Sequence, residues 1–177
     1  QPQHDLFHVY TVDEHTILAV EALRHIKSGQ FSAELRICTA LMSQLDYYER
    51  GSVMLYLAVL LHDIAKGRGG DHQLKGALIA RQVCLRLGLS DAETSMVSWL
   101  VGRHLDFSRT AFRRDISDPN TVRSFARQVG TQRRLEFLLL LTVADIRAVG
   151  PNAWNLWKAE LLRRLYNLAL STLKRGV

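Results

Sequence analysis

Apolar residues recur at helical spacing along almost the whole chain, and this periodicity constrains the fold more than any other feature of the sequence. Runs that alternate between apolar and polar residues are absent, as are the Asn-Gly and Asp-Gly pairs that close tight hairpins. The sequence therefore predicts an all-α fold. A chain of 177 residues is the size of one domain. We expect a single bundle of roughly eight to ten helices, with any metal site between core helices.

Capping signals divide this pattern into separate helices. Thr11 with Glu14 and Ser90 with Glu93 have the spacing of a capping box, and an Asp-Pro pair marks the start of a later helix. The glycine-rich segment 67–71 should be a loop, because glycine disfavours helix. The signals predict helices over residues 11–28, 32–45, 51–63, 72–88, 90–104, 118–130, 131–150 and 153–174, of which the third is apolar on all sides and should be central.

The net charge of +6 indicates a surface that attracts anionic partners. Nucleic acid, an acidic protein and a phosphorylated substrate all fit, but the arginine pairs lack the aromatic and glycine signatures of nucleic-acid modules, so we disfavour nucleic acid. No apolar run is long enough to span a membrane, and the first residues do not resemble a signal peptide. Cys38 and Cys84 fit reduced, buried thiols. We expect a cytoplasmic protein that does not enter a membrane.

Two acidic residues stand inside strongly apolar segments. His62 and Asp63 follow two leucines, and Asp145 lies in the segment 141–146. Burying an unpaired carboxylate costs several kcal/mol, so each needs a partner such as a metal ion or an arginine. Imidazoles and carboxylates without a thiolate suit manganese, iron, zinc or magnesium. The sequence therefore predicts a site for a divalent ion.

The order His15, His62-Asp63, Asp145 resembles the signature of the HD superfamily of phosphohydrolases. Longer strings are similar to the central domain of the bifunctional PII uridylyltransferase/uridylyl-removing enzymes, in which the HD domain hydrolyses UMP from a tyrosine of the PII protein. These strings cover residues 10–16, 61–72, 113–116, 141–146 and 154–158. The resemblance implies that residues 1–177 are an HD domain excised from a larger enzyme, where nucleotidyltransferase and ACT domains flank it.

The resemblance also implies roles for individual residues. One divalent ion, Mn²⁺ or Mg²⁺ before Fe²⁺ or Zn²⁺, would be held by His15, His62, Asp63 and Asp145. A second ion, if present, would share Asp63 with His72 and His104, so the site holds one or two ions. Apart from the resemblance, hydrolysis of a phosphodiester needs positive charge at the phosphoryl oxygens. We expect Lys66 and Arg68 to act in catalysis together with His62 and Asp63, by contacting these oxygens, with a solvated cation at a helix end as the alternative for Lys66.

Two other functions stay open at this point. An HD enzyme of this kind could act on free nucleotides or cyclic dinucleotides, and a metal-containing domain without catalysis could serve in regulation or docking. The presence of all four primary ligands disfavours the inactive domain, because a degenerate domain is expected to lose ligands. The aromatic residues Trp154, Trp157 and Tyr166 are placed in the last helix and expected to pack against the bundle.

Overall fold

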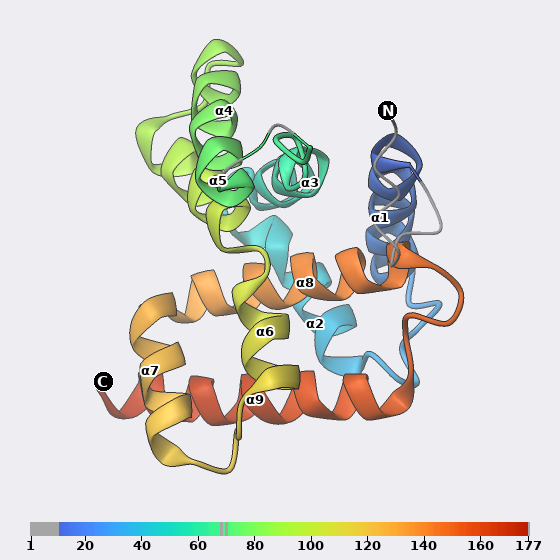
Figure 1. The fold of residues 1–177 in the computed structure, drawn as a ribbon, viewed down its shortest axis with the longest axis vertical. Coiled ribbons are helices and arrows are strands. Elements are labelled where there is room, and N and C mark those ends of the chain that lie inside the picture. The colour runs from blue at the N-terminus through green and yellow to red at the C-terminus, as the bar shows by residue number, and fades with distance from the viewer. Residues whose placement is uncertain (1–10, 68, 70, 177) are drawn as a thin grey trace.

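The computed structural model describes residues 11–67, 69 and 71–176, and these residues form nine α-helices and one short 3₁₀ helix (Figure 1). The all-α prediction is confirmed, since no strand occurs in this part of the chain. The helices are α1 (Val12–Lys27), α2 (Arg36–Gln44), η1 (Leu45–Tyr47), α3 (Gly51–Leu61), α4 (His72–Arg86), α5 (Asp91–Arg103), α6 (Asp106–Arg113), α7 (Pro119–Val129), α8 (Gln132–Val149) and α9 (Leu156–Arg175).

Helix α8 forms the centre of the bundle. Every residue from Leu135 to Ala144 is buried, and α8 contacts α1, α2, α3, α5, α6, α7 and α9. In Figure 1 it crosses the middle of the molecule, with α9 running antiparallel below it and the ends of α1, α3 and α5 above it. The prediction that residues 51–63 form the central helix was wrong, because α3 leaves Leu60 49% exposed on its outer side.

The predicted helix starts at capping residues are confirmed. Thr11 with Glu14 and Ser90 with Glu93 form complete capping boxes at α1 and α5. The side chain of Asp71 accepts hydrogen bonds from two backbone amides at the start of α4. These contacts span only two or three residues, which is why sequence spacing alone predicts them.

Two helices begin later than predicted. Residues 29–34 form turns instead of the first turn of α2, and the Glu34 carboxylate binds Arg147 Nη1 at 2.6 Å and Trp154 Nε1 at 3.4 Å. Helix α9 begins after Asn155, whose side chain accepts a hydrogen bond from the Lys158 amide, so Trp154 precedes the helix. These long-range contacts have no signature in local spacing.

The remaining differences concern α6 and the aromatic residues. Residues 106–113 form α6, a helix that the sequence patterns did not separate from its neighbours. Tyr166 is buried as expected, but Trp157 is 62% exposed and only stacks along the ring of Phe112. None of the described helices is both long enough and apolar enough to cross a membrane.

Helices α4 and α5 pack very closely, and glycines allow this approach. A Cβ atom at Gly76 would lie 3.2 Å from Val101 Cγ1, and one at Gly102 would lie 3.2 Å from Ala77 Cβ. Because the two helices run in opposite directions, their contact brings the start of α4 near the end of α5. His72 begins α4 and His104 directly follows α5, so this packing determines how these two histidines lie.

Candidate metal centre

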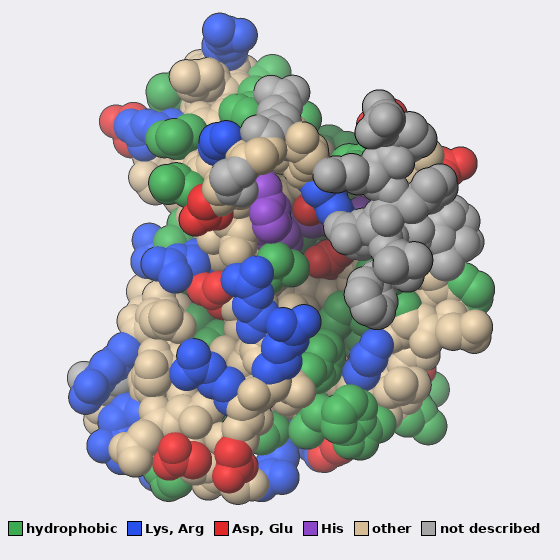
Figure 2. Space-filling view, viewed as in Figure 1, with side chains coloured by type: hydrophobic (Ala, Val, Ile, Leu, Met, Phe, Trp, Pro, Cys, Tyr) green, Lys and Arg blue, Asp and Glu red, His purple; other side chains and the backbone are tan. Residues whose placement is uncertain are grey.

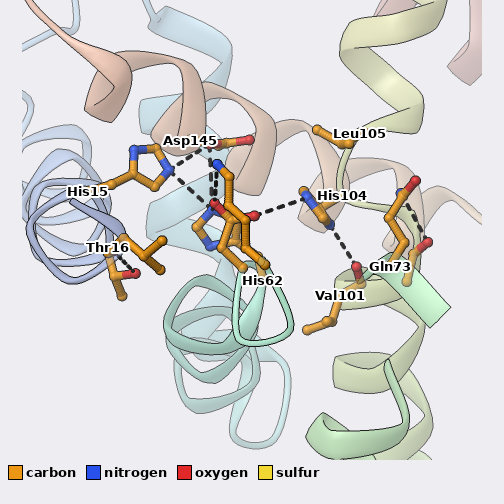
Figure 3. A network of polar contacts seen from close by, with 12 residues as sticks. His15, Thr16, His62, Gln73, Val101, His104, Leu105 and Asp145 are labelled. Atoms are coloured by element: carbon orange, nitrogen blue, oxygen red, sulfur yellow. Dashed lines mark hydrogen bonds and ion pairs between the residues drawn. The ribbon is translucent and has the colours of Figure 1, made fainter. Parts of the chain in front are cut away.

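Three residues far apart in the sequence meet at one point of the bundle (Figure 3). His15 comes from the first turn of α1, His62 directly follows α3, and Asp145 lies in α8. The two histidine Nε2 atoms are 3.2 Å apart. Asp145 Oδ1 lies 2.9 Å from Nε2 of His15 and 3.5 Å from Nε2 of His62. We call these three residues the primary cluster.

The local structure fixes the direction of His62. Its Nδ1 atom lies 2.7 Å from the backbone oxygen of Val59, one turn earlier. A carbonyl oxygen only accepts hydrogen bonds, so Nδ1 carries a proton and donates it to this bond. In the neutral ring, Nε2 then presents a lone pair to the other two residues, which is the state that a metal ligand requires.

The spacing of the primary cluster suits a divalent ion. Three ligand atoms of the cluster, one from each residue, lie within 4.8 Å of one another. Metal bonds of about 2.0–2.1 Å give ligand-to-ligand distances of about 2.9 Å in an octahedron and about 3.4 Å in a tetrahedron. The three observed distances of 3.2, 2.9 and 3.5 Å are close to these values. The residues present therefore fit a metal ion.

When no ion is bound, His62 and Asp145 shift each other's pKa. Burial lowers the pKa of His62. The hydrogen bond to Asp145 and the negative charges of Asp145 and Asp63 have a larger, opposite effect and raise this pKa from 6.5 to about 9. Burial likewise raises the pKa of Asp145, while hydrogen bonds from His15 and His62 hold it well below its usual range. Because the pKa of His62 is raised when no ion is bound, ion binding must displace a proton from this ring at neutral pH.

His104 lies on the other side of His62 from His15 (Figure 3), and the Asp63 carboxylate contacts both His62 and His104. Asp63 Oδ2 is 3.6 Å from His62 Nε2, and its Oδ1 is 3.8 Å from His104 Nε2. Both residues are buried, and His104 Nδ1 donates to the backbone oxygen of Val101 at 2.7 Å, as His62 does to its own helix. We call Asp63 and His104 the secondary pair. His72 follows at a distance of 6.2 Å between its ring centre and that of His104.

The cations predicted near the site have different places. Lys66 Nζ lies 3.2 Å from Asp63 Oδ2, at the edge of the secondary pair. Burial raises the pKa of Asp63, but the charges of His62 and Lys66 lower it to below its usual value. Arg68 lies outside the described residues. Arg103, which precedes His104, pairs with Asp106 at 3.3 Å instead of facing the site.

One residue of the site neighbourhood was missed by the sequence interpretation. Gln73 follows His72, donates from Nε2 to the backbone oxygen of Gly102 at 3.3 Å and accepts from Arg109 at 2.9 Å. It thereby joins α4, α5 and α6, and Figure 3 shows Gln73 near His104. The position directly after a predicted ligand was the only signal in the sequence.

Figure 2 shows that histidine side chains are visible near the centre of one face, between hydrophobic and basic side chains. Solvent can therefore reach part of the site. Most of each ring is nevertheless buried, with His15, His62 and His104 each 1% exposed.

Comparison with known proteins identifies relatives of the whole chain. It is 52% identical over all 177 residues to a bifunctional uridylyltransferase/uridylyl-removing enzyme of Azospirillum brasilense and 49% identical over 177 residues to one of Nitrosococcus oceani. A protein of the same description from Thiobacillus denitrificans is 50% identical over 174 residues, or 98% of this chain. The chain spans about a fifth of the length of these relatives, 18% to 20%.

The sequence model of the HD domain family matches residues 35–149. This range contains His62, Asp63, His104 and Asp145, whereas His15 lies before it and joins the site through α1. The match covers more than half of the chain and includes the central helix α8. The chain belongs to the HD domain family.

Proposed function

We propose that the chain is the uridylyl-removing part of a larger enzyme, a metal-dependent phosphodiesterase that hydrolyses the bond between UMP and a tyrosine of the PII protein. The primary cluster carries this proposal, because two imidazoles and one carboxylate already lie at metal-ligand spacing. The similarity of about 50% to uridylyl-removing enzymes along the whole chain supports the substrate class. In this proposal the flanking nucleotidyltransferase and ACT domains belong to other parts of the full-length enzyme.

The residues would hold the metal in a defined order. His15, His62 and Asp145 would bind the first ion, Asp63 would lie between the two positions, and His104 with His72 would take part in a second. The proposed ion is Mn²⁺ or Mg²⁺, with Fe²⁺ or Zn²⁺ as alternatives, because the ligands are carboxylates and imidazoles without a thiolate. When bound, the ion supplies a water of lowered pKa and positive charge for the phosphoryl oxygens.

The protein's own groups would orient the ester. Asp63 holds the Lys66 ammonium at the edge of the site, where this cation would contact a non-bridging oxygen of the phosphodiester. Arg68 is proposed for the same role. Attack by water on phosphorus breaks the bond to the tyrosine oxygen, and the phenolate leaves with a reference pKa of about 10, which makes it a better leaving group than an alkoxide.

The test is to incubate the chain and Mn²⁺ with uridylylated PII, in parallel with a panel of free nucleotides and cyclic dinucleotides. We expect release of UMP from PII, which His62→Ala and Asp63→Ala abolish while circular dichroism and thermal denaturation show that both variants remain folded. The matched control is His25→Ala, at a half-buried histidine at the other end of the same helix as His15.

Two outcomes would contradict the proposal. Hydrolysis of free nucleotides or cyclic dinucleotides alone would assign the site to another phosphohydrolase class. Binding of Mn²⁺ and PII without hydrolysis of any substrate would favour a docking or regulatory domain.

A further inference from the structure

A groove of about 630 Å³ lies beside the metal centre, where α4, α5 and α6 meet the first turn of α8. Each of these helices contributes an arginine to its lining, namely Arg81, Arg103, Arg109 and Arg134. We call it the arginine groove. In Figure 2, Lys and Arg side chains lie to the left of and below the visible histidines.

The arginine groove has an excess of positive charge. Two aspartates also line it, but the Asp71 carboxylate is bound to backbone amides at the start of α4, and Asp106 pairs with Arg103 at 3.3 Å. In the part of the chain that the structure describes, neither Arg81 nor Arg134 forms an ion pair with a carboxylate. The groove therefore favours an anionic partner.

A chain of hydrogen bonds within the lining of the arginine groove includes residues that are close in sequence to two histidines of the site. Arg109 donates to Gln73 at 2.9 Å, and Gln73 donates to the backbone oxygen of Gly102 at 3.3 Å. Gln73 follows His72 in the chain, and Gly102 comes two residues before His104. The lining of the groove thus includes Gln73 and Arg103, the direct chain neighbours of His72 and His104.

The surroundings of the arginines favour a protein over a nucleic acid. The Arg134 guanidinium lies 4.8 Å from the ring centre of Trp99 and covers the aromatic face on which a base would stack. The side chain of Leu74 lines the groove and is 61% exposed, which suits an apolar side chain of a partner and not a polyphosphate backbone. The arginines of the groove would pair with carboxylates of a polypeptide, and Leu74 would contact one of its apolar side chains.

We propose that the arginine groove docks an acidic segment of the protein that carries the nucleotide, and that this contact positions the ester at the metal centre. The inference rests on the proposed hydrolysis of a protein-linked nucleotide. It adds a second point of recognition: the metal centre binds the phosphodiester, and the groove distinguishes a protein substrate from a small one.

The test compares two substrates of the same site, uridylylated PII and the p-nitrophenyl ester of UMP. The variant combines Arg81→Glu with Arg134→Glu, and the matched control combines Arg123→Glu with Arg127→Glu, two exposed arginines of α7 with the same change in net charge. We expect the ratio of kcat/KM for PII to kcat/KM for the ester to fall at least about tenfold in the groove variant and to stay within about twofold in the control. The loss should lie in KM for PII and should shrink as salt concentration increases.

Several results would overturn the docking proposal. An equal fall in kcat/KM for both substrates would show that the arginines act on the ester itself or on folding. Thermal denaturation and the single variant Arg81→Glu distinguish these two causes. An equal fall in the control would show an effect of net charge alone. Stronger competition by single-stranded poly(U) than by poly-glutamate would assign the groove to nucleic acid.

The failure of the proposed function would look different. In that case the wild-type protein would hydrolyse neither substrate, whereas fluorescence anisotropy would still report whether labelled PII binds the groove. Binding that is lost in the groove variant and kept in the control would support the docking surface by itself, and binding that is equal in both would contradict it.

Discussion

His15 of the primary cluster and His104 of the secondary pair lie on opposite sides of His62 (Figure 3), and the two groups are built differently. In the primary cluster, His15, His62 and Asp145 approach to between 2.9 and 3.5 Å. In the secondary pair, the nearest atoms of Asp63 and His104 are 3.8 Å apart, and a lysine contacts the same carboxylate.

The difference follows from where the side chains are anchored. Helices α1, α3 and α8 pack directly against one another, and the primary cluster comes from these helices or the residue directly after one of them. His62, Asp63 and His104 all lie in turns that follow a helix, so only His15 and Asp145, which lie within α1 and α8, are held by a helix itself. Rigid helices in the core hold ligands at their binding distance, whereas turns and helix ends allow adjustment when a ligand arrives.

The largest effect that separates the two regions should come from single substitutions of their ligands. Asp145→Asn keeps the size of the side chain but removes the charge between His15 and His62. We expect Mn²⁺ to bind more tightly at the primary cluster than at the secondary pair. Asp145→Asn should weaken the tighter event at least about 100-fold, because loss of a residue that only hydrogen-bonds to a ligand already costs about 10- to 100-fold. His104→Ala should leave that binding within about threefold and abolish a weaker, second binding event.

Titration calorimetry and electron paramagnetic resonance of the apo-protein measure both events. Equal losses of the tighter binding in the two variants would show that both regions form one inseparable site. Thermal denaturation of each variant provides the control for folding.

The pH dependence of ion binding should also differ between the regions. His62 has a pKa raised from 6.5 to about 9, because the carboxylate of Asp145 outweighs the effect of burial. Below this pH a proton must leave before the ion binds, so affinity at the primary cluster should rise as pH rises, by roughly tenfold per pH unit. Burial lowers the pKa of His104, so the weaker binding should change less with pH over the same range.

Calorimetry in buffers of different ionisation enthalpy measures the protons released. Release of about one proton at neutral pH is expected for the tighter event. A tighter binding event that is independent of pH would contradict the protonated state of His62.

The smallest expected effect concerns Lys66, which lies 3.2 Å from Asp63 Oδ2. Lys66→Met removes a cation that competes with the second ion, so the weaker binding should become about threefold tighter, as for a partly exposed ion pair. Release of UMP should become slower if the proposed contact between the ammonium group and the phosphodiester exists. Calorimetry measures the tighter ion binding and steady-state kinetics the slower release of UMP. Lys174→Met, at an exposed position, is the control. A parallel loss of binding and rate would indicate a structural role.

Sequence reasoning succeeded where the interactions are local. The capping residues Thr11, Ser90 and Asp118 all cap helices as predicted, because their side chains bond to amides two or three positions ahead. It failed where a distant contact competes with helix formation. Glu34 binds Arg147 and Trp154 across the fold, and the predicted first turns of two helices are missing at these places.

The candidate site shows the same limit. The order of His15, His62 and Asp145 made them ligand candidates by resemblance, and the structure brings their ligand atoms together. Gln73 and Arg109 are 36 positions apart and have no common motif. Their hydrogen bond between α4 and α6 depends on the close packing of α4 against α5, which the sequence pattern does not show. Spacing along the chain does not encode such pairs.

The sequence by itself determined the helical class and the residue types of the metal centre, because periodicity, caps and ligand chemistry are properties of short segments. Only the tertiary structure decided which ligands lie at binding distance, that α8 and not α3 is central, and that an arginine groove adjoins the site. The physical reason is that burial and ligand distances depend on how whole helices pack, and this packing is a sum over contacts between residues far apart in the chain.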